Sequence, residues 1–180
     1  MSSTVETPLY STGRHVALRL KPGEEVLGTL HQFVVDHGIA ACAIVSSVGS
    51  LTHAAIRYAN QNDTTRLEGH FEICSLIGTL ECAAPGEALN GAEASAAGGA
   101  HVHLSISDGA GRMIGGHMMR GCRVYTTLEI VLLVLDGLRF TREPCEASGY
   151  AELVIRNASE GMKNKRIRPK ETETTGIKDR

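Results

Sequence analysis

From residue 41 to residue 142 the chain is a succession of short apolar segments separated by turn-forming residues, and this succession limits the fold more than any other feature. The segments are rich in β-branched and aliphatic residues, which predicts strands. Most of the connecting loops are too short to hold a crossover helix, so we expect antiparallel pairing and not a doubly wound arrangement. The predicted strands cover residues 41–48, 54–58, 69–80, 101–107, 112–118, 124–135 and 138–142.

One clear helix is predicted ahead of these strands. After a strand at 15–20, apolar residues recur at helical spacing over 26–34, and Gly38 is a natural stop. Glu24 and Glu25 suit the positive N-terminal end of this helix. The fold class that follows is α/β of the α+β type, with a mostly antiparallel sheet of six to seven strands packed against one main helix.

The run Ile130-Val131-Leu132-Leu133-Val134-Leu135 has no polar alternation. A strand with this pattern is expected to be buried on both faces. The helix or another subunit could provide the cover, and the sequence leaves both open.

The length of 180 residues and the hydrophobic content of 42% suit one domain with tails. We expect a flexible N-terminus at 1–12, the folded domain at 13–156 and a disordered polar and basic tail at 157–180. Within the domain, residues 83–99 are rich in Ala, Gly and Glu, which predicts a mobile surface loop.

The net charge of −2 gives the chain no overall electrostatic reason to bind nucleic acid or an anionic membrane. No apolar run is long enough to cross a bilayer, and the N-terminus lacks a signal-peptide pattern. Five cysteines without a Cys-x-x-Cys pair fit reduced thiols. We therefore expect a cytoplasmic protein with no membrane partner, and the nucleus is the alternative location.

Two glycine-led histidine clusters are the candidate chemistry of the chain. Gly98-Gly99-Ala100-His101-Val102-His103 and Gly115-Gly116-His117 flank the turn-like Asp108-Gly109-Ala110-Gly111. The i, i+2 spacing places His101 and His103 on one face of a strand, about 7 Å apart at their backbones, so both rings can reach one ion. His117 across the turn would complete a divalent-metal site. The alternative is that these are strand histidines bonded to backbone groups.

The register of this hairpin decides whether His117 joins the pair. With a four-residue loop at 108–111, simple pairing places His117 opposite Val102 and on the wrong face. A slip of one residue corrects this, and the Gly115-Gly116 pair permits a β-bulge. We therefore predict a bulge at these glycines, which would also allow another backbone to come close.

A set of short motifs follows the chain in a fixed order. They are Gly23-Glu24-Glu25-Val26, Ser46-Ser47-Val48-Gly49-Ser50, Leu67-Glu68-Gly69-His70-Phe71-Glu72-Ile73, Ser75-Leu76-Ile77-Gly78, His101-Val102-His103-Leu104-Ser105, Gly111, Gly115-Gly116-His117 and Thr127-Leu128-Glu129. In this order they resemble the plants-and-prokaryotes-conserved (PPC) domain, over about residues 13–156.

The resemblance implies an α/β fold that assembles as a homotrimer, and in plant members the domain is joined to AT-hook motifs that bind the DNA minor groove. This chain has no Arg-Gly-Arg-Pro core, because isoleucine replaces the glycine in Arg166-Ile167-Arg168-Pro169. It has His70 where plant members have arginine, and it is similar to the free-standing prokaryotic type. A weak contact with DNA or with a chromatin protein through the basic tail stays open.

In the prokaryotic type, the positions that match His101, His103 and His117 look like metal ligands. The resemblance therefore implies a transition metal. Zinc suits three neutral imidazoles best, and iron, nickel and copper are alternatives. Three protein ligands leave an open position for water or substrate.

Glu129 is the candidate catalytic residue near such a site. It could be a fourth ligand, an acceptor for an imidazole N–H or a general base. The alternative is a strand-end charge paired with Arg120 or Arg123.

Other side chains are minor candidates. Cys122 could be a further ligand, and Ser105 shares the face of His103 and could touch a ligand. Cys42 and Cys74 are expected to be packing residues. We find no serine or cysteine with the neighbouring base that nucleophilic catalysis needs.

Three functions fit this pattern. The first is a trimeric interaction domain that associates with DNA or chromatin. The second is a metal-dependent hydrolase or lyase, or a small-molecule binding protein. The third treats the metal as a structural clasp in the trimer, and the sequence does not separate it from the second.

Overall fold

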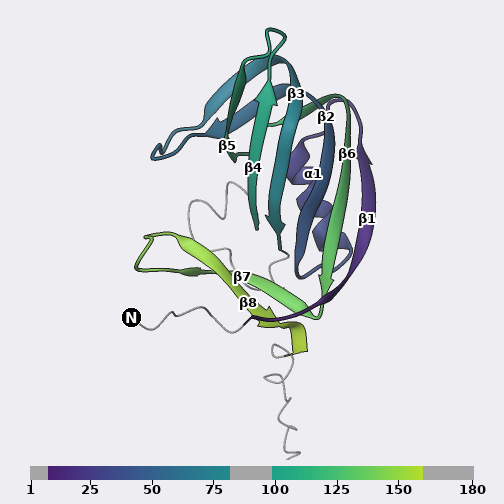
Figure 1. The fold of residues 1–180 in the computed structure, drawn as a ribbon, viewed down its shortest axis with the longest axis vertical. Coiled ribbons are helices and arrows are strands. Elements are labelled where there is room, and N and C mark those ends of the chain that lie inside the picture. The colour runs from purple at the N-terminus through teal and green to yellow at the C-terminus, as the bar shows by residue number, and fades with distance from the viewer. Residues whose placement is uncertain (1–7, 82–98, 160–180) are drawn as a thin grey trace, which may run out of the picture.

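A six-stranded antiparallel sheet with a helix on one face makes up most of the structure (Figure 1). The computed structural model describes residues 8–81 and 99–159. The strand order is β1-β6-β2-β3-β4-β5, and β7 and β8 form a separate two-stranded sheet. The expected α+β fold is confirmed. The elements are β1 (Thr12–Leu20), α1 (Val26–Asp36), β2 (Cys42–Arg57), β3 (Thr65–Leu80), β4 (Ala100–Ser107), β5 (Met113–Met118), β6 (Arg123–Asp136), β7 (Leu138–Pro144) and β8 (Ala151–Asn157).

Most of the predicted loop at 83–99 and of the two predicted tails lies outside the described residues. The described part of the chain contains no helix that is long and apolar enough to cross a membrane.

Strand β2 is longer than the sequence predicts. The predicted strands at 41–48 and 54–58 are two parts of one strand. Gly49, which lies between them, packs against β6, where an added Cβ would lie 2.3 Å from the carbonyl oxygen of Thr127. The register of β2 then shifts between Leu51 and His53. The chain therefore continues through an irregularity instead of reversing at a turn.

Glu25 fixes the start of α1. Its side chain accepts a hydrogen bond from the backbone N–H of Gly28, and it also accepts one from the N–H of Gly121, at 2.9 Å. The first bond satisfies a free donor at the helix N-terminus. The second ties the helix to the turn between β5 and β6.

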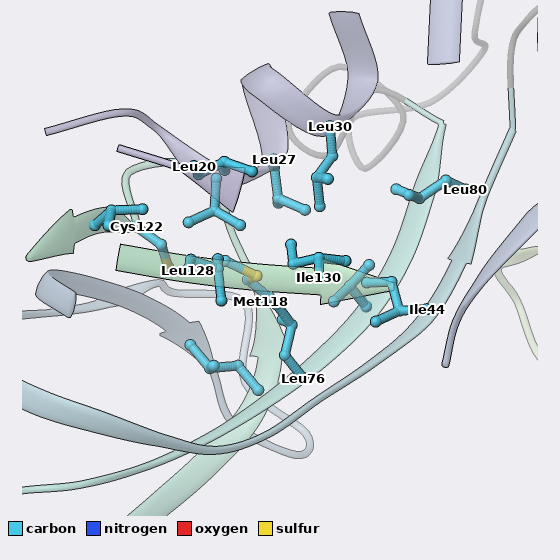
Figure 2. Close-up of a cluster of buried hydrophobic side chains, with 14 of the residues drawn as sticks. Leu20, Leu27, Leu30, Ile44, Leu76, Leu80, Met118, Cys122, Leu128 and Ile130 are labelled. Atoms are coloured by element: carbon cyan, nitrogen blue, oxygen red, sulfur yellow. The ribbon is translucent and has the colours of Figure 1, made fainter. Parts of the chain in front are cut away.

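The core lies between α1 and the sheet face that the helix covers (Figure 2). Helix residues Val26, Leu27, Leu30 and Val34 are buried, and their spacing places them on one side of the helix. The opposite face of the six-stranded sheet, called here the outer face, is not covered by α1. The buried strand and turn residues around the helix include Leu20, Ile44, Leu76, Leu80, Met118, Cys122, Leu128 and Ile130.

The apolar run of β6 is divided between the two faces. Ile130, Leu132 and Val134 are buried in the core. Residues 131, 133 and 135 point to the other face and are half-buried. Leu135 packs against the β7–β8 hairpin. Burial on both faces is therefore confirmed in part, because the helix covers one face and the chain's own hairpin covers one end of the other.

The β7–β8 hairpin packs across the end of the outer face. The backbone N–H of Phe140 donates to the carbonyl oxygen of Ala40 at 3.1 Å, and Leu138 and Phe140 are buried with Ala41. Figure 1 shows the hairpin passing below the ends of β3 and β4. The sequence pattern does not indicate β8, because Leu153 to Ile155 form an apolar block without alternation.

Strand β2 also pairs with β5, which closes β2, β3, β4 and β5 into a ring of strands. Arg57 on β2 pairs with His117 on β5. Gly116 lies at this crossing, where an added Cβ would be 2.7 Å from the carbonyl oxygen of Arg57 and 2.9 Å from Cγ2 of Ile56. The close approach of a second backbone, predicted from the glycine pair, is confirmed at this position.

We predict that Gly116→Ala lowers the free energy of unfolding by about 1–3 kcal/mol, because the methyl group overpacks the β2–β5 contact. Chemical denaturation of both proteins measures the difference. Gly109→Ala is the matched control, since nothing lies within 4 Å of a Cβ at that position. Equal stability of Gly116→Ala and Gly109→Ala would show that the crossing tolerates a side chain.

Candidate metal centre

Asp108 fixes the turn between β4 and β5. Its Oδ1 accepts hydrogen bonds from the backbone N–H groups of Ala110 (2.9 Å) and Arg112 (3.0 Å). Its own N–H donates to the carbonyl oxygen of Arg112 at 3.1 Å. The Arg112 side chain donates to the same carboxylate and holds its pKa below the usual value. Gly111 takes the left-handed φ of 76° that closes this short loop.

The turn sets the register of the hairpin. Because Asp108 faces Arg112, the loop has three residues, and the pairing continues without a shift from Ser107 with Met113 to His103 with His117. The predicted bulge at Gly115-Gly116 is therefore wrong. The loop is one residue shorter than the sequence predicts, and this change of register places His117 directly opposite His103.

His101, His103 and His117 converge on the outer face. Their ring centroids are 5.3 Å apart for His101 and His103, 5.2 Å for His101 and His117, and 5.6 Å for His103 and His117. One ring nitrogen from each lies within 4.8 Å of the others. His101 and His103 are exposed and His117 is half-buried. The three side chains can hold a metal ion.

The donor set suits a transition metal. Imidazole nitrogens are typical ligands of zinc, copper, iron and nickel, whereas magnesium and calcium prefer oxygen. Among the described residues, the group consists of the three histidines and includes no carboxylate or thiol. Zinc with three protein ligands keeps a fourth position open.

A buried ion pair lies beside the histidines. Arg142 on β7 donates from Nε to Oε1 of Glu81 at 3.0 Å and from Nη2 to Oγ1 of Thr79 at 3.2 Å. Thr79 pairs directly with His101. Burial raises the pKa of the Glu81 carboxyl, and Arg142 acts in the opposite direction. Sequence reasoning misses this pair, because Arg142 is far from the histidines in the chain and belongs to no motif.

Glu129 is not brought into the group. It lies on β6, paired with Arg19 on β1 and with Val48 on β2. Strands β2 and β3 separate β6 from β4, which carries His101 and His103. One chain therefore does not place Glu129 next to the three imidazoles.

Ser105 does lie beside the group. It is two residues beyond His103 on β4 and pairs with Gly115 on β5. A Cβ at Gly115 would lie 2.7 Å from the Ser105 Oγ. The glycine therefore leaves space around a hydroxyl on the same face as the histidines.

The cysteines are separate from the histidine group. Cys122 is buried in the core, where its Sγ accepts the backbone N–H of Ala55 at 3.2 Å and burial raises the pKa of its thiol to about 11. Burial raises the pKa of the Cys42 thiol to about 12, as expected for a packing residue. Cys74 is exposed, so the packing role predicted for it is wrong. It lies at the register shift between Ile73 and Ser75.

The chain matches the family model of the Plants and Prokaryotes Conserved (PCC) domain over residues 9–136. It is 35% identical over 160 residues to the Bifunctional protein GlmU of Synechococcus sp. (strain JA-3-3Ab). That match covers 89% of this chain and 23% of the GlmU protein. The chain therefore spans about a quarter of the length of this curated relative.

Solved structures share the fold along most of their length. A hypothetical protein from Salmonella enterica is 48% identical with a TM-score of 0.73, covering 83% of this chain and 98% of its own. A plant- and prokaryote-conserved protein from Pyrococcus horikoshii is 28% identical with a TM-score of 0.66, covering 82% and 95%.

Two more distant structures share the fold alone. A protein from Archaeoglobus fulgidus that is described as metal-containing is 23% identical with a TM-score of 0.65, covering 83% of this chain and 99% of its own. A protein from Bacteroides thetaiotaomicron that is described as a candidate DNA-binding protein is 14% identical with a TM-score of 0.60, covering 82% and 97%.

Proposed function

This chain belongs to the Plants and Prokaryotes Conserved (PCC) domain family, and we propose that it binds a transition metal, with zinc the best match, through His101, His103 and His117. The observation that carries the proposal is the convergence of three ring nitrogens within 4.8 Å of one another. The protein of the same fold from Archaeoglobus fulgidus, described as metal-containing, supports it.

The site is open to a small molecule. In one chain His101 and His103 are exposed, so a ligand can approach them from solvent there. Ser105 lies on the same face, and its hydroxyl can donate or accept a hydrogen bond. A metal bound at such a site polarises a carbonyl group or activates water. Because Glu129 is separated from the histidines within one chain, the geometry supports small-molecule binding better than a hydrolase or lyase reaction.

We predict about one transition-metal ion per chain in untagged protein, and loss of nearly all of it in His101→Ala, His103→Ala and His117→Ala. Each substitution removes one of three nitrogen ligands. Elemental analysis of proteins purified without added metal measures the content. His70→Ala is the matched control, because His70 packs against Tyr125 and is outside the group.

Full metal content in both His101→Ala and His117→Ala would rule out this ligand assignment.

Removal of the metal by a chelator distinguishes a ligand-binding role of the metal from a structural role as a clasp in the trimer. A clasp would make the thermal midpoint and the assembly mass fall when the metal is removed, because metal binding would then contribute to folding. A ligand-binding site on a formed sheet predicts little change in either.

We also propose that the chain assembles as a homotrimer, as its resemblance to the family implies. Three apolar side chains on the outer face support an interface. Val45, Val48 and Ile77 are 53%, 64% and 57% exposed, and they lie on the adjacent strands β2 and β3. Neighbouring exposed apolar side chains are typical of a protein–protein contact.

We predict that light scattering gives the mass of three copies of the 19.2-kDa chain, and that Val48→Glu lowers the mass toward one copy. The substitution would bury an unpaired charge in the contact. Val35→Glu is the matched control, since Val35 is 42% exposed on α1, away from the outer face. A trimer that survives Val48→Glu, or dissociates equally with Val35→Glu, would contradict the proposed interface.

A weak association with DNA is the second candidate function. The fold neighbour from Bacteroides thetaiotaomicron, described as a candidate DNA-binding protein, favours it. The net charge of −2 makes a contact through the whole surface unfavourable, so the basic tail is the better candidate. The basic residues of the tail are Lys163, Lys165, Arg166, Arg168 and Lys170.

The reduced thiols and a DNA partner both fit a cytoplasmic location.

We predict that any DNA affinity of the full chain is weak and is lost when residues after 159 are deleted. If all five basic residues contact phosphates, raising salt from 50 to 200 mM should weaken binding by on the order of a hundredfold or more. Fluorescence anisotropy with a labelled duplex measures both effects. Binding that survives the deletion, or that does not respond to salt, would exclude the tail as the contact.

A further inference from the structure

The β7–β8 hairpin brings a guanidinium group to the edge of the three-histidine group. Leu138, Phe140 and Arg142 are alternate residues of β7, so they share one face of the strand. Leu138 and Phe140 are buried against Ala41 at the end of the outer face. Arg142 follows them and contacts Thr79 on β3 and Glu81, the residue after the end of β3.

Thr79 links Arg142 to the histidines. It pairs directly with His101, and side chains of directly paired residues lie on the same side of a sheet. The Thr79 hydroxyl accepts a hydrogen bond from Nη2 of Arg142 at 3.2 Å. The guanidinium is therefore held at the strand position next to His101.

Glu81 holds the guanidinium in place. The Nε–Oε1 distance is 3.0 Å, and the side chains of Arg142 and Glu81 are 15% and 3% exposed. The bonds to Glu81 and Thr79 use two of the five N–H groups of an arginine. In the described part of the chain, a fixed donor group with further hydrogen-bonding capacity thus lies beside the histidines.

We propose that Arg142 is a ligand-binding residue that makes the three-histidine site selective for small molecules carrying an oxyanion, a carboxylate or a phosphate group. The inference rests on the proposed metal function, because the ligand would fill the open position next to the histidines. Arginine recognises carboxylate and phosphate oxygens through paired N–H groups. A group that is anchored before the ligand arrives loses little freedom on binding it.

Arg142 and the histidines come from different parts of the chain. It lies beyond residues 9–136, the part that matches the family model. The histidines thus lie within the matched residues, and Arg142 lies after them, on β7.

The test uses the full chain loaded with cobalt(II), whose visible spectrum reports the metal site and changes when an anion enters it. Inorganic phosphate and acetate are titrated separately, so the stronger response identifies the oxyanion class. The variants are Arg142→Lys, Glu81→Gln, and the double variant Glu81→Gln with Arg142→Met, which avoids a buried unpaired carboxylate. Arg156→Met is the matched control, because Arg156 lies on the same hairpin and pairs with Glu143.

The double variant should keep the cobalt spectrum and bind the preferred anion about tenfold more weakly. Arg142→Lys should give an intermediate affinity, and Arg156→Met should match the wild type. Glu81→Gln should tighten anion binding, because it removes the negative charge next to Arg142. The comparison of Glu81→Gln with the double variant isolates the contribution of Arg142, because both variants lack the Glu81 charge.

Two results would overturn the inference, and they are distinguishable. Equal anion affinity in Glu81→Gln and the double variant, with a normal cobalt spectrum, would leave the metal site standing and remove Arg142 from the ligand. A wild-type chain that takes up no cobalt would overturn both the metal function and this inference.

Discussion

The pairing of Asp108 with Arg112 across the β4–β5 turn is the interaction on which the candidate site depends. Side chains alternate between the two faces of a strand, so a shift of one residue would turn His117 away from His101 and His103. Five hydrogen bonds within the turn hold the loop at three residues. A local interaction in a short loop thereby decides whether three imidazoles can share one ion.

The sheet then holds this arrangement on both sides. His117 pairs with His103 on β4 and with Arg57 on β2, so β5 lies between two hydrogen-bonded neighbours near the site. Gly116 makes the second contact sterically feasible. All three histidines come from strands of one closed ring, and groups on paired strands are positioned more precisely than groups on loops. The three imidazoles would therefore need little rearrangement to bind the proposed metal.

The sequence predicts the fold class and the convergence of the three histidines well, because both depend largely on short-range patterns. Strand alternation and the i, i+2 spacing of His101 and His103 are local signals. The loop length that aligns His117 is harder to predict from the sequence, because it depends on the hydrogen bonds that the Asp108 side chain accepts from Ala110 and Arg112. Cys74 shows the same limit, because it lies at a register shift and its side chain is exposed although its strand is largely apolar.

Arg142 and Glu129 are harder still, because their distance from the histidines is a property of strand order. Glu129 lies closer to His117 in the chain than Arg142 does, yet β2 and β3 separate it from β4. Arg142 lies further along, and β7 returns it to Thr79 beside His101. Proximity in sequence favours Glu129, whereas antiparallel order and a returning hairpin place Arg142 nearer the histidines. The chemistry of the outer face is thus built from two levels. The strand pattern supplies the proposed metal ligands, and the packing of a second small sheet supplies the charged group next to them.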